Sequence, residues 1–160
     1  MAEGTAAGHW RTLTLLSGLS REGVMAAMTI ESPTDGDVLL TYVEQVLCPR
    51  LRPGQVVVLD NLPAHKVDGV RNLIKTVGAE LLYWPPYSPD FNPIEPAWSK
   101  IKQQLRSAKA RTLETLQAAV TPALTQITIQ NAAGRFTHCD MLYGNRRNAP
   151  GVRRYLREGR

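Results

Sequence analysis

The sequence lacks the features of a metal-stabilised, disulfide-bonded or membrane-spanning protein. It has only two cysteines, Cys48 and Cys139, which lie far apart and form neither a CxxC pattern nor part of a Cys/His cluster, and this argues against a zinc site. It has no segment typical of a signal peptide. The longest uncharged run, residues 115–134, contains Gln, Thr and Pro122 and is unsuited to crossing a bilayer. We therefore expect a soluble, intracellular protein in a reducing compartment.

The charge is distributed unevenly along a chain of single-domain length. The 160 residues are 43% hydrophobic, which is enough to form a core. Residues 1–99 carry seven basic and eleven acidic side chains, a net charge of −4, whereas residues 100–160 carry twelve basic and three acidic ones, a net charge of +9. This asymmetry favours a polyanionic partner, nucleic acid before membrane. A solvated basic surface is the alternative.

The hydrophobic pattern predicts an α/β fold with a mixed sheet flanked by helices. A turn at residues 20–23 separates two β-rich runs, and helices and strands then alternate. The aliphatic run QVVVL shows no alternation, which is typical of a strand buried on both faces in the middle of a sheet. The expected strands are residues 9–19, 24–30, 55–59 and 79–84. The expected helices are residues 38–47, 66–77, 92–107 and about 113–127, the last either separate or a continuation of the helix before it.

Asp60 is the first candidate for a functional side chain. It follows the most hydrophobic predicted strand directly, at the edge of an α/β sheet where ligands usually bind. The alternative is a structural role in which Asp60 caps the turn that follows. A phosphotransfer enzyme with Asp60 as phosphoryl acceptor is a further possible function. It is disfavoured because such enzymes need a second acid close by and position 62 is Leu62.

Glu95 is the second candidate, and it also has a structural alternative. Asn92 as N-cap, Pro93 at the first helical position and Glu95 three residues after the cap form a capping arrangement. The preceding loop contains four prolines in the ten residues 84–93. Such a stiff loop is suited to presenting a carboxylate at a fixed position.

A basic stripe is predicted on the helix that Glu95 begins. At 100° per residue, Ser99 and three cations lie close to the face of Glu95, while Trp98, Ile101, Leu105 and Ala108 form a neighbouring apolar stripe. An acid followed by cations suits a phosphate site from which a nucleic-acid backbone continues. A solvated stripe is the alternative. The three cations are Lys102, Arg106 and Lys109.

Two motifs together resemble a known family. The segments VVVLDNLPAHK (56–66) and YWPPYSPDFNPIEPAWSKIK (83–102) resemble the catalytic region of IS630/Tc1/mariner superfamily transposases, the bacterial IS630 branch in particular. Between Asp60 and Glu95 lie 34 residues, the interval expected between the second and third acids of that superfamily's DDE/D triad. The resemblance extends over residues 8 to about 143.

The resemblance implies a fold, a chemistry and partners. It implies an RNase H-like domain over residues 1–145, followed by a basic tail at 146–160, and DNA cleavage and joining with two Mg²⁺ ions, for which Mn²⁺ substitutes. The implied partners are double-stranded DNA, with transposon terminal repeats and a TA target, and a second copy of the chain; no membrane is involved. A cytoplasmic, nucleoid-associated bacterial protein is implied. Asp60 and Glu95 would be catalytic metal ligands. Asn61 and His65 would either support the metal ligands or contact DNA, with an ordinary surface histidine as the alternative for His65, and Lys66 would contact DNA.

The N-terminal region of the sequence departs from the family pattern. The first acid of this fold lies on a strand that precedes the hairpin, and residues 1–8 contain only Glu3, in a stretch without strand character. We likewise expect the helix-turn-helix domain that reads transposon ends to lie outside these residues. We expect the first strand and first carboxylate to come from the product of an upstream, overlapping reading frame, and little strand transfer by this chain alone. The alternative is a non-catalytic DNA-binding remnant of a decayed or frameshifted transposase.

Overall fold

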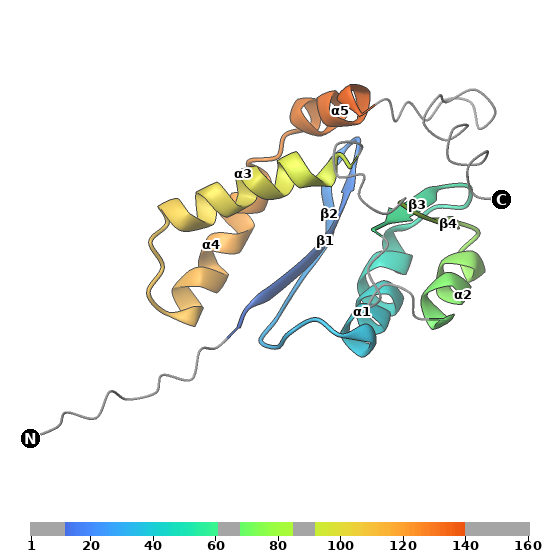
Figure 1. Cartoon of the computed structure of the whole chain (residues 1–160), viewed down its shortest axis with the longest axis horizontal. Coiled ribbons are helices and arrows are strands. Elements are labelled where there is room, and N and C mark those ends of the chain that lie inside the picture. Colours follow the sequence, from blue (N-terminus) through green and yellow to red (C-terminus); the bar gives the residue numbers. More distant parts are fainter. Residues whose placement is uncertain (1–11, 61–67, 85–91, 140–160) are drawn as a thin grey trace, which may run out of the picture.

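A computed structural model describes residues 12–60, 68–84 and 92–139. These residues form a three-layer arrangement in which a β-hairpin lies between two groups of helices (Figure 1). The strands are β1 (Thr14–Ser20), β2 (Gly23–Ile30), β3 (Val56–Leu59) and β4 (Glu80–Tyr83). The helices are α1 (Gly36–Tyr42), the π-helical η1 (Val43–Leu47), the 3-10 turn η2 (Cys48–Arg50), α2 (Asp68–Thr76), α3 (Ile94–Ser107), α4 (Leu113–Thr125) and α5 (Ile129–His138). None of the described helices is long and apolar enough to cross a membrane.

The predicted hairpin is confirmed, with one irregularity. β1 and β2 pair antiparallel from Thr14↔Ile30 to Ser20↔Gly23, and Gly23 has a φ of 126°, which glycine adopts easily. Between the pairs Leu16↔Met28 and Gly18↔Met25, β2 has one more residue than β1. This β-bulge places Ala26 at a φ of 51°, a conformation that L-residues rarely adopt.

The second pair of strands is parallel and stands apart from the first. β3 and β4 pair in register from Val56↔Glu80 to Leu59↔Tyr83. The prediction of a central strand buried on both faces is wrong for β3, since each of its four residues is half-buried and, among the described residues, β3 pairs only with β4. In place of one predicted mixed sheet, the described residues form one antiparallel and one parallel two-stranded ladder.

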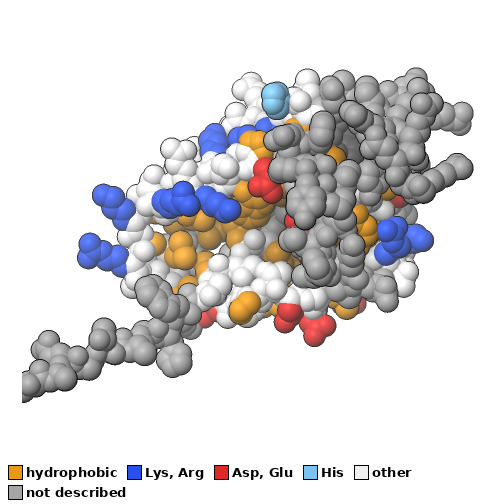
Figure 2. Space-filling model, viewed as in Figure 1, with side chains coloured by type: hydrophobic (Ala, Val, Ile, Leu, Met, Phe, Trp, Pro, Cys, Tyr) orange, Lys and Arg blue, Asp and Glu red, His pale blue; other side chains and the backbone are white. Residues whose placement is uncertain are grey.

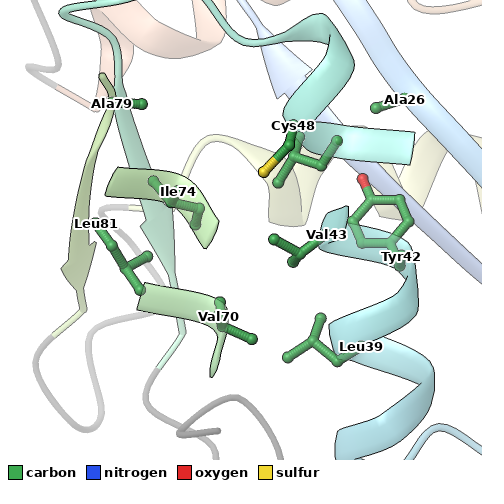
Figure 3. Packing of buried hydrophobic residues seen from close by; sticks show 10 residues of the cluster. Ala26, Leu39, Tyr42, Val43, Cys48, Val70, Ile74, Ala79 and Leu81 are labelled. Carbon is green, nitrogen blue, oxygen red and sulfur yellow. The ribbon is translucent and has the colours of Figure 1, made fainter. Parts of the chain in front are cut away.

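Two hydrophobic clusters form the core, and the hairpin contributes to both. The first cluster joins α1, η1 and α2 to β3 and β4, with Val43, Val70 and Ile74 fully buried (Figure 3). Leu16 packs against this cluster. Leu15, the next residue along β1, packs against the second cluster, which α3, α4 and α5 form. Successive side chains of a strand point to opposite faces, so one strand serves both clusters.

The three last helices settle one alternative that the sequence leaves open and add one helix that it does not predict. α4 is separate from α3, because Lys109 turns the chain with a φ of 47° and Thr112 begins a new helix with a capping box to Thr115. α5 was not predicted. Its beginning is marked by Thr128, whose Oγ1 accepts a hydrogen bond of 3.2 Å from the Asn131 backbone N–H.

Candidate active site

Asp60 lies at the carboxyl end of the parallel ladder. It follows Leu59, whose carbonyl accepts a hydrogen bond of 2.8 Å from the Trp84 N–H, so the pairing of β3 with β4 continues to this edge. The side chain is half-buried, and its Oδ1 atom is buried from solvent. The ladder therefore fixes the position of one carboxylate at the edge where parallel strands usually present ligand-binding groups.

A side chain from α2 supports the same edge and was missed by sequence reasoning. The Arg71 Nη1 atom donates a hydrogen bond of 3.2 Å to the Leu81 carbonyl, and its guanidinium carbon lies 5.6 Å from the centroid of the Tyr83 ring. This is a cation–π distance. Tyr83 pairs with Leu59 and thus lies beside the residue that precedes Asp60. The residues involved are ten and twelve positions apart, and nothing in their local pattern indicates the contact.

Glu95 lies in the first turn of α3 and is exposed. The prediction of Asn92 as N-cap is wrong by one residue, because Pro93 is the N-cap and makes no side-chain capping hydrogen bond, while the Asn92 Oδ1 atom accepts a hydrogen bond of 3.3 Å from the Ile94 N–H. Among the described residues, the Glu95 carboxylate makes no hydrogen bond or ion pair. The helix end is therefore formed without the Glu95 carboxylate, which is left available for another ligand.

The chain path relates the two carboxylates to each other. β4 runs parallel to β3 and leaves the sheet at the edge where Asp60 lies, and residues 85–91 then lead to α3. In Figure 1 the end of α3 that carries Glu95 is the end turned toward β3 and β4. Carboxylate oxygens are the ligands that Mg²⁺ and Mn²⁺ prefer. Across residues 12–60, 68–84 and 92–139, no three His, Cys, Asp or Glu side chains come together as a metal site, so a metal site at Asp60 and Glu95 stays a prediction.

The basic stripe is present over part of its predicted length. Lys102 and Arg106 are exposed on α3, and Figure 2 shows Lys and Arg side chains gathered over the part of the molecule where α3 and α4 lie. The prediction that Lys109 continues this helical face is wrong, because α3 ends at Ser107 and Lys109 has a φ of 47°. Ala108 is exposed instead of joining the apolar stripe.

Several predicted positions lie outside the described residues. Asn61, His65 and Lys66 belong to residues 61–67, most of the proline-rich segment 84–93 to residues 85–91, and the basic tail to residues 140–160. Their roles, and the domain division at 145, therefore remain predictions.

Known proteins resemble this chain in sequence and in fold. Residues 2–117 match the family described as DDE superfamily endonuclease. The transposable element Tcb1 transposase of Caenorhabditis briggsae is 39% identical over 51 residues, 32% of this chain, and the Tcb2 transposase of the same organism is 35% identical over 51 residues. The chain spans only 19% of the length of these two relatives.

Solved structures with the same fold include transposase and integrase domains. The Mos1 transposase catalytic domain with Raltegravir and Mg has a TM-score of 0.63 and 15% identity, covering 78% of this chain and 68% of that chain. The Mos1 strand transfer complex has a TM-score of 0.63 and 18% identity, with coverage of 87% and 42%. The catalytic core domain of BIV integrase has a TM-score of 0.53 and 17% identity, with coverage of 92% and 86%.

Proposed function

Because this chain belongs to the DDE superfamily endonuclease family, we propose that it supplies catalytic residues for DNA transposition, with Asp60 and Glu95 as two of its metal ligands. The superfamily resemblance and the RNase H-like fold predicted from the sequence are both confirmed. The assignment to the IS630 branch stays a prediction. The observation that carries the proposal is the placement of Asp60 at the carboxyl end of β3 and of an uncommitted Glu95 at the start of α3.

The two carboxylates would hold a divalent ion, Mg²⁺ or Mn²⁺. Such an ion, when bound, polarises a phosphodiester and activates the attacking hydroxyl. Mos1 transposase structures with Mg and with Mn support this choice of ions. Holding two ions against their mutual repulsion requires more negative charge than two carboxylates supply. We therefore propose that a third acid comes from upstream sequence encoded in an overlapping frame.

Lys102 and Arg106 would bind the DNA backbone. Both are exposed, and they follow Glu95 along one side of α3, so a strand whose phosphate lies at the carboxylates would continue over the two cations. Mos1 complexes with transposon ends support DNA as the partner. The finer proposals are binding of terminal repeats, a TA target, a homodimer that joins two ends, and a cytoplasmic, nucleoid-associated location in a bacterium.

The proposal is tested by nicking of a terminal-repeat oligonucleotide in Mg²⁺ or Mn²⁺. The chain would be extended with the upstream frame, and Asp60→Ala and Glu95→Ala would each be introduced into the extended protein. We expect each substitution to lower the nicking rate at least about 100-fold, equivalent to about 2.7 kcal/mol of transition-state stabilisation. Glu80→Ala is the matched control, because Glu80 is an exposed acid at the opposite end of β4, and it should leave the rate unchanged.

DNA binding by the same proteins gives a second measurement. Lys102→Ala and Arg106→Ala should each reduce the slope of log K against log salt by about 1, whereas Gln103→Ala, an exposed neutral position on α3, should not. Undiminished nicking by either acid variant contradicts the catalytic assignment. Retained DNA binding without any nicking indicates a non-catalytic DNA-binding protein.

A further inference from the structure

Lys100 differs from the other cations of α3 in that its charge is already engaged within the protein. Its Nζ atom lies 2.8 Å from the Gln126 carbonyl oxygen and 2.8 Å from Oδ1 of Asn131. These partners lie 26 and 31 residues away, at the end of α4 and in the first turn of α5. The side chain is half-buried. Lys100 therefore links three helices and is not part of the exposed stripe of Lys102 and Arg106.

Both acceptors are suited to holding an ammonium group. Gln126 is the C-cap of α4, where the carbonyls carry the negative end of the helix dipole and favour a cation. The Asn131 N–H is held by Thr128 at 3.2 Å, which fixes the residue whose side chain accepts from Lys100. Charge-assisted hydrogen bonds of this length are among the strong ones. The turn between α4 and α5 thus forms a preformed socket for Lys100.

The position of Lys100 around α3 determines how its hydrogen bonds affect the orientation of the helix. At 100° per residue, the buried residues Ala97 and Ile101 mark the side of α3 that faces the second cluster. Lys100 lies about 100° from Ile101 on one flank of this side, and Glu95 lies about 120° from Ile101 on the other flank. Trp98 and Leu105, on the Glu95 side of Ile101, also pack against the second cluster. The hydrogen bonds of Lys100 hold the opposite flank, so the two sets of contacts together limit rotation of α3 about its axis and set the direction of Glu95.

We propose that Lys100 is a positioning residue for Glu95, which sets the orientation of α3 and so the direction in which the carboxylate meets the metal. This inference rests on the proposed function, since it requires Glu95 to be a metal ligand. Outer contacts that orient a metal ligand typically change metal affinity by 10–100-fold. Lys100 acts through Glu95 and does not touch the ion.

The test is Mn²⁺ binding by the full chain, measured by electron paramagnetic resonance and calorimetry. Lys100→Ala should raise the Kd for Mn²⁺ about tenfold. Lys100→Arg should restore the Kd to within about threefold of the unaltered chain, because it keeps a positive charge and several N–H donors at this position. Gln103→Ala is the matched control, since it shortens an exposed side chain of the same helix that has no part in the proposed site, and it should leave the Kd unchanged.

A double substitution separates positioning from a general loss of structure. If Lys100 acts through Glu95, Lys100→Ala combined with Glu95→Ala raises the Kd no further than Glu95→Ala alone. Additive effects overturn the proposal, and so does a lower melting temperature of Lys100→Ala with an unchanged Kd. Failure of the proposed function looks different: the unaltered chain then binds no Mn²⁺, or Asp60→Ala and Glu95→Ala leave its Kd unchanged.

Discussion

Tyr42 is a buried side chain whose polar group makes no hydrogen bond with any described residue. It is 5% exposed and lies in the first cluster, with its hydroxyl directed to the side where Ala26 and Cys48 lie (Figure 3). A buried hydroxyl without a partner reduces stability by about 1–3 kcal/mol. Tyr42→Phe should therefore raise the free energy of unfolding at neutral pH by about 1 kcal/mol, measured by urea denaturation. A loss of stability would show that the hydroxyl has a partner.

The same residue makes stability depend on alkaline pH. Burial raises the pKa of Tyr42 above its ordinary value of 10.0. Burial also raises the pKa of Cys48 and of Cys139 above 9.0, and at Cys48 the negative charge of Glu44 raises it further. The folded state keeps these protons at pH values where the unfolded state has lost them. Stability is therefore complete below about pH 9 and falls as the pH rises, by up to about 1.4 kcal/mol per pH unit for each group. Tyr42→Phe should make the decline above pH 10 shallower than in the unaltered chain.

The β-bulge makes two neighbouring alanines respond differently to the same substitution. Ala26 is 7% exposed and has a φ of 51°, whereas Ala27 is exposed with an ordinary strand conformation. Ala26→Val should destabilise the protein by about 2–4 kcal/mol, because a β-branched residue is strained there and overfills the core. Ala27→Val should change stability by less than about 0.5 kcal/mol. Chemical denaturation of the two variants checks this, and equal effects would contradict the assigned conformation.

At the candidate site, local sequence patterns indicate the proposed metal ligands but give no signal for the contacts made around them. Asp60 and Glu95 are indicated by a strand end and a helix start, which are local signals. Lys100 and Arg71 act through contacts with residues distant in the chain, and such contacts exist only once the helices have packed.

Two glycines, one just after a helix and one inside a helix, should respond in opposite ways to substitution by alanine. Gly78 follows α2 with a φ of 75°, and an added Cβ would lie 3.1 Å from Cβ of Pro53. Gly134 lies within α5, where an added Cβ meets nothing within 4 Å. Gly78→Ala should destabilise by about 1–2 kcal/mol, and Gly134→Ala should stabilise by about 1 kcal/mol because alanine favours the helix interior. Thermal denaturation checks both, and changes of the same sign would contradict the reasoning.

Hydrophobic periodicity predicts helices and strands well where one face is clearly apolar, and poorly where an element buries few residues. The helices from α1 to α3 and the hairpin lie within a few residues of their predicted bounds. The break between α3 and α4 was left open because it depends on Lys109 adopting an unusual backbone conformation. α5 was missed because it buries little more than Ala132 and Phe136, a short pattern within a polar stretch.

For the whole molecule, the hairpin should couple the two clusters. Leu15 and Leu16 are adjacent in β1 but pack against different clusters. Leu16→Ala should speed amide hydrogen exchange first in α1 and α2, and Leu15→Ala first in α3 and α4, with each substitution lowering global stability by about 2–3 kcal/mol. Mass spectrometry of exchanged peptides resolves these regions. Identical exchange patterns in the two variants would show that the clusters do not respond separately.

The bulge at Ala26 also affects which insertions and deletions in the gene the protein can tolerate. Before the bulge Val24 packs against the second cluster, but after it Met28, also an even-numbered residue, packs against the first. The extra residue therefore switches which face every later position of β2 occupies. Loss of the extra residue would leave Met28 opposite Leu16 and restore regular alternation, whereas loss of a residue elsewhere in β2 would exchange the faces of one part of the strand. In evolving lineages this hairpin should accept many substitutions, while insertions and deletions away from the bulge are eliminated.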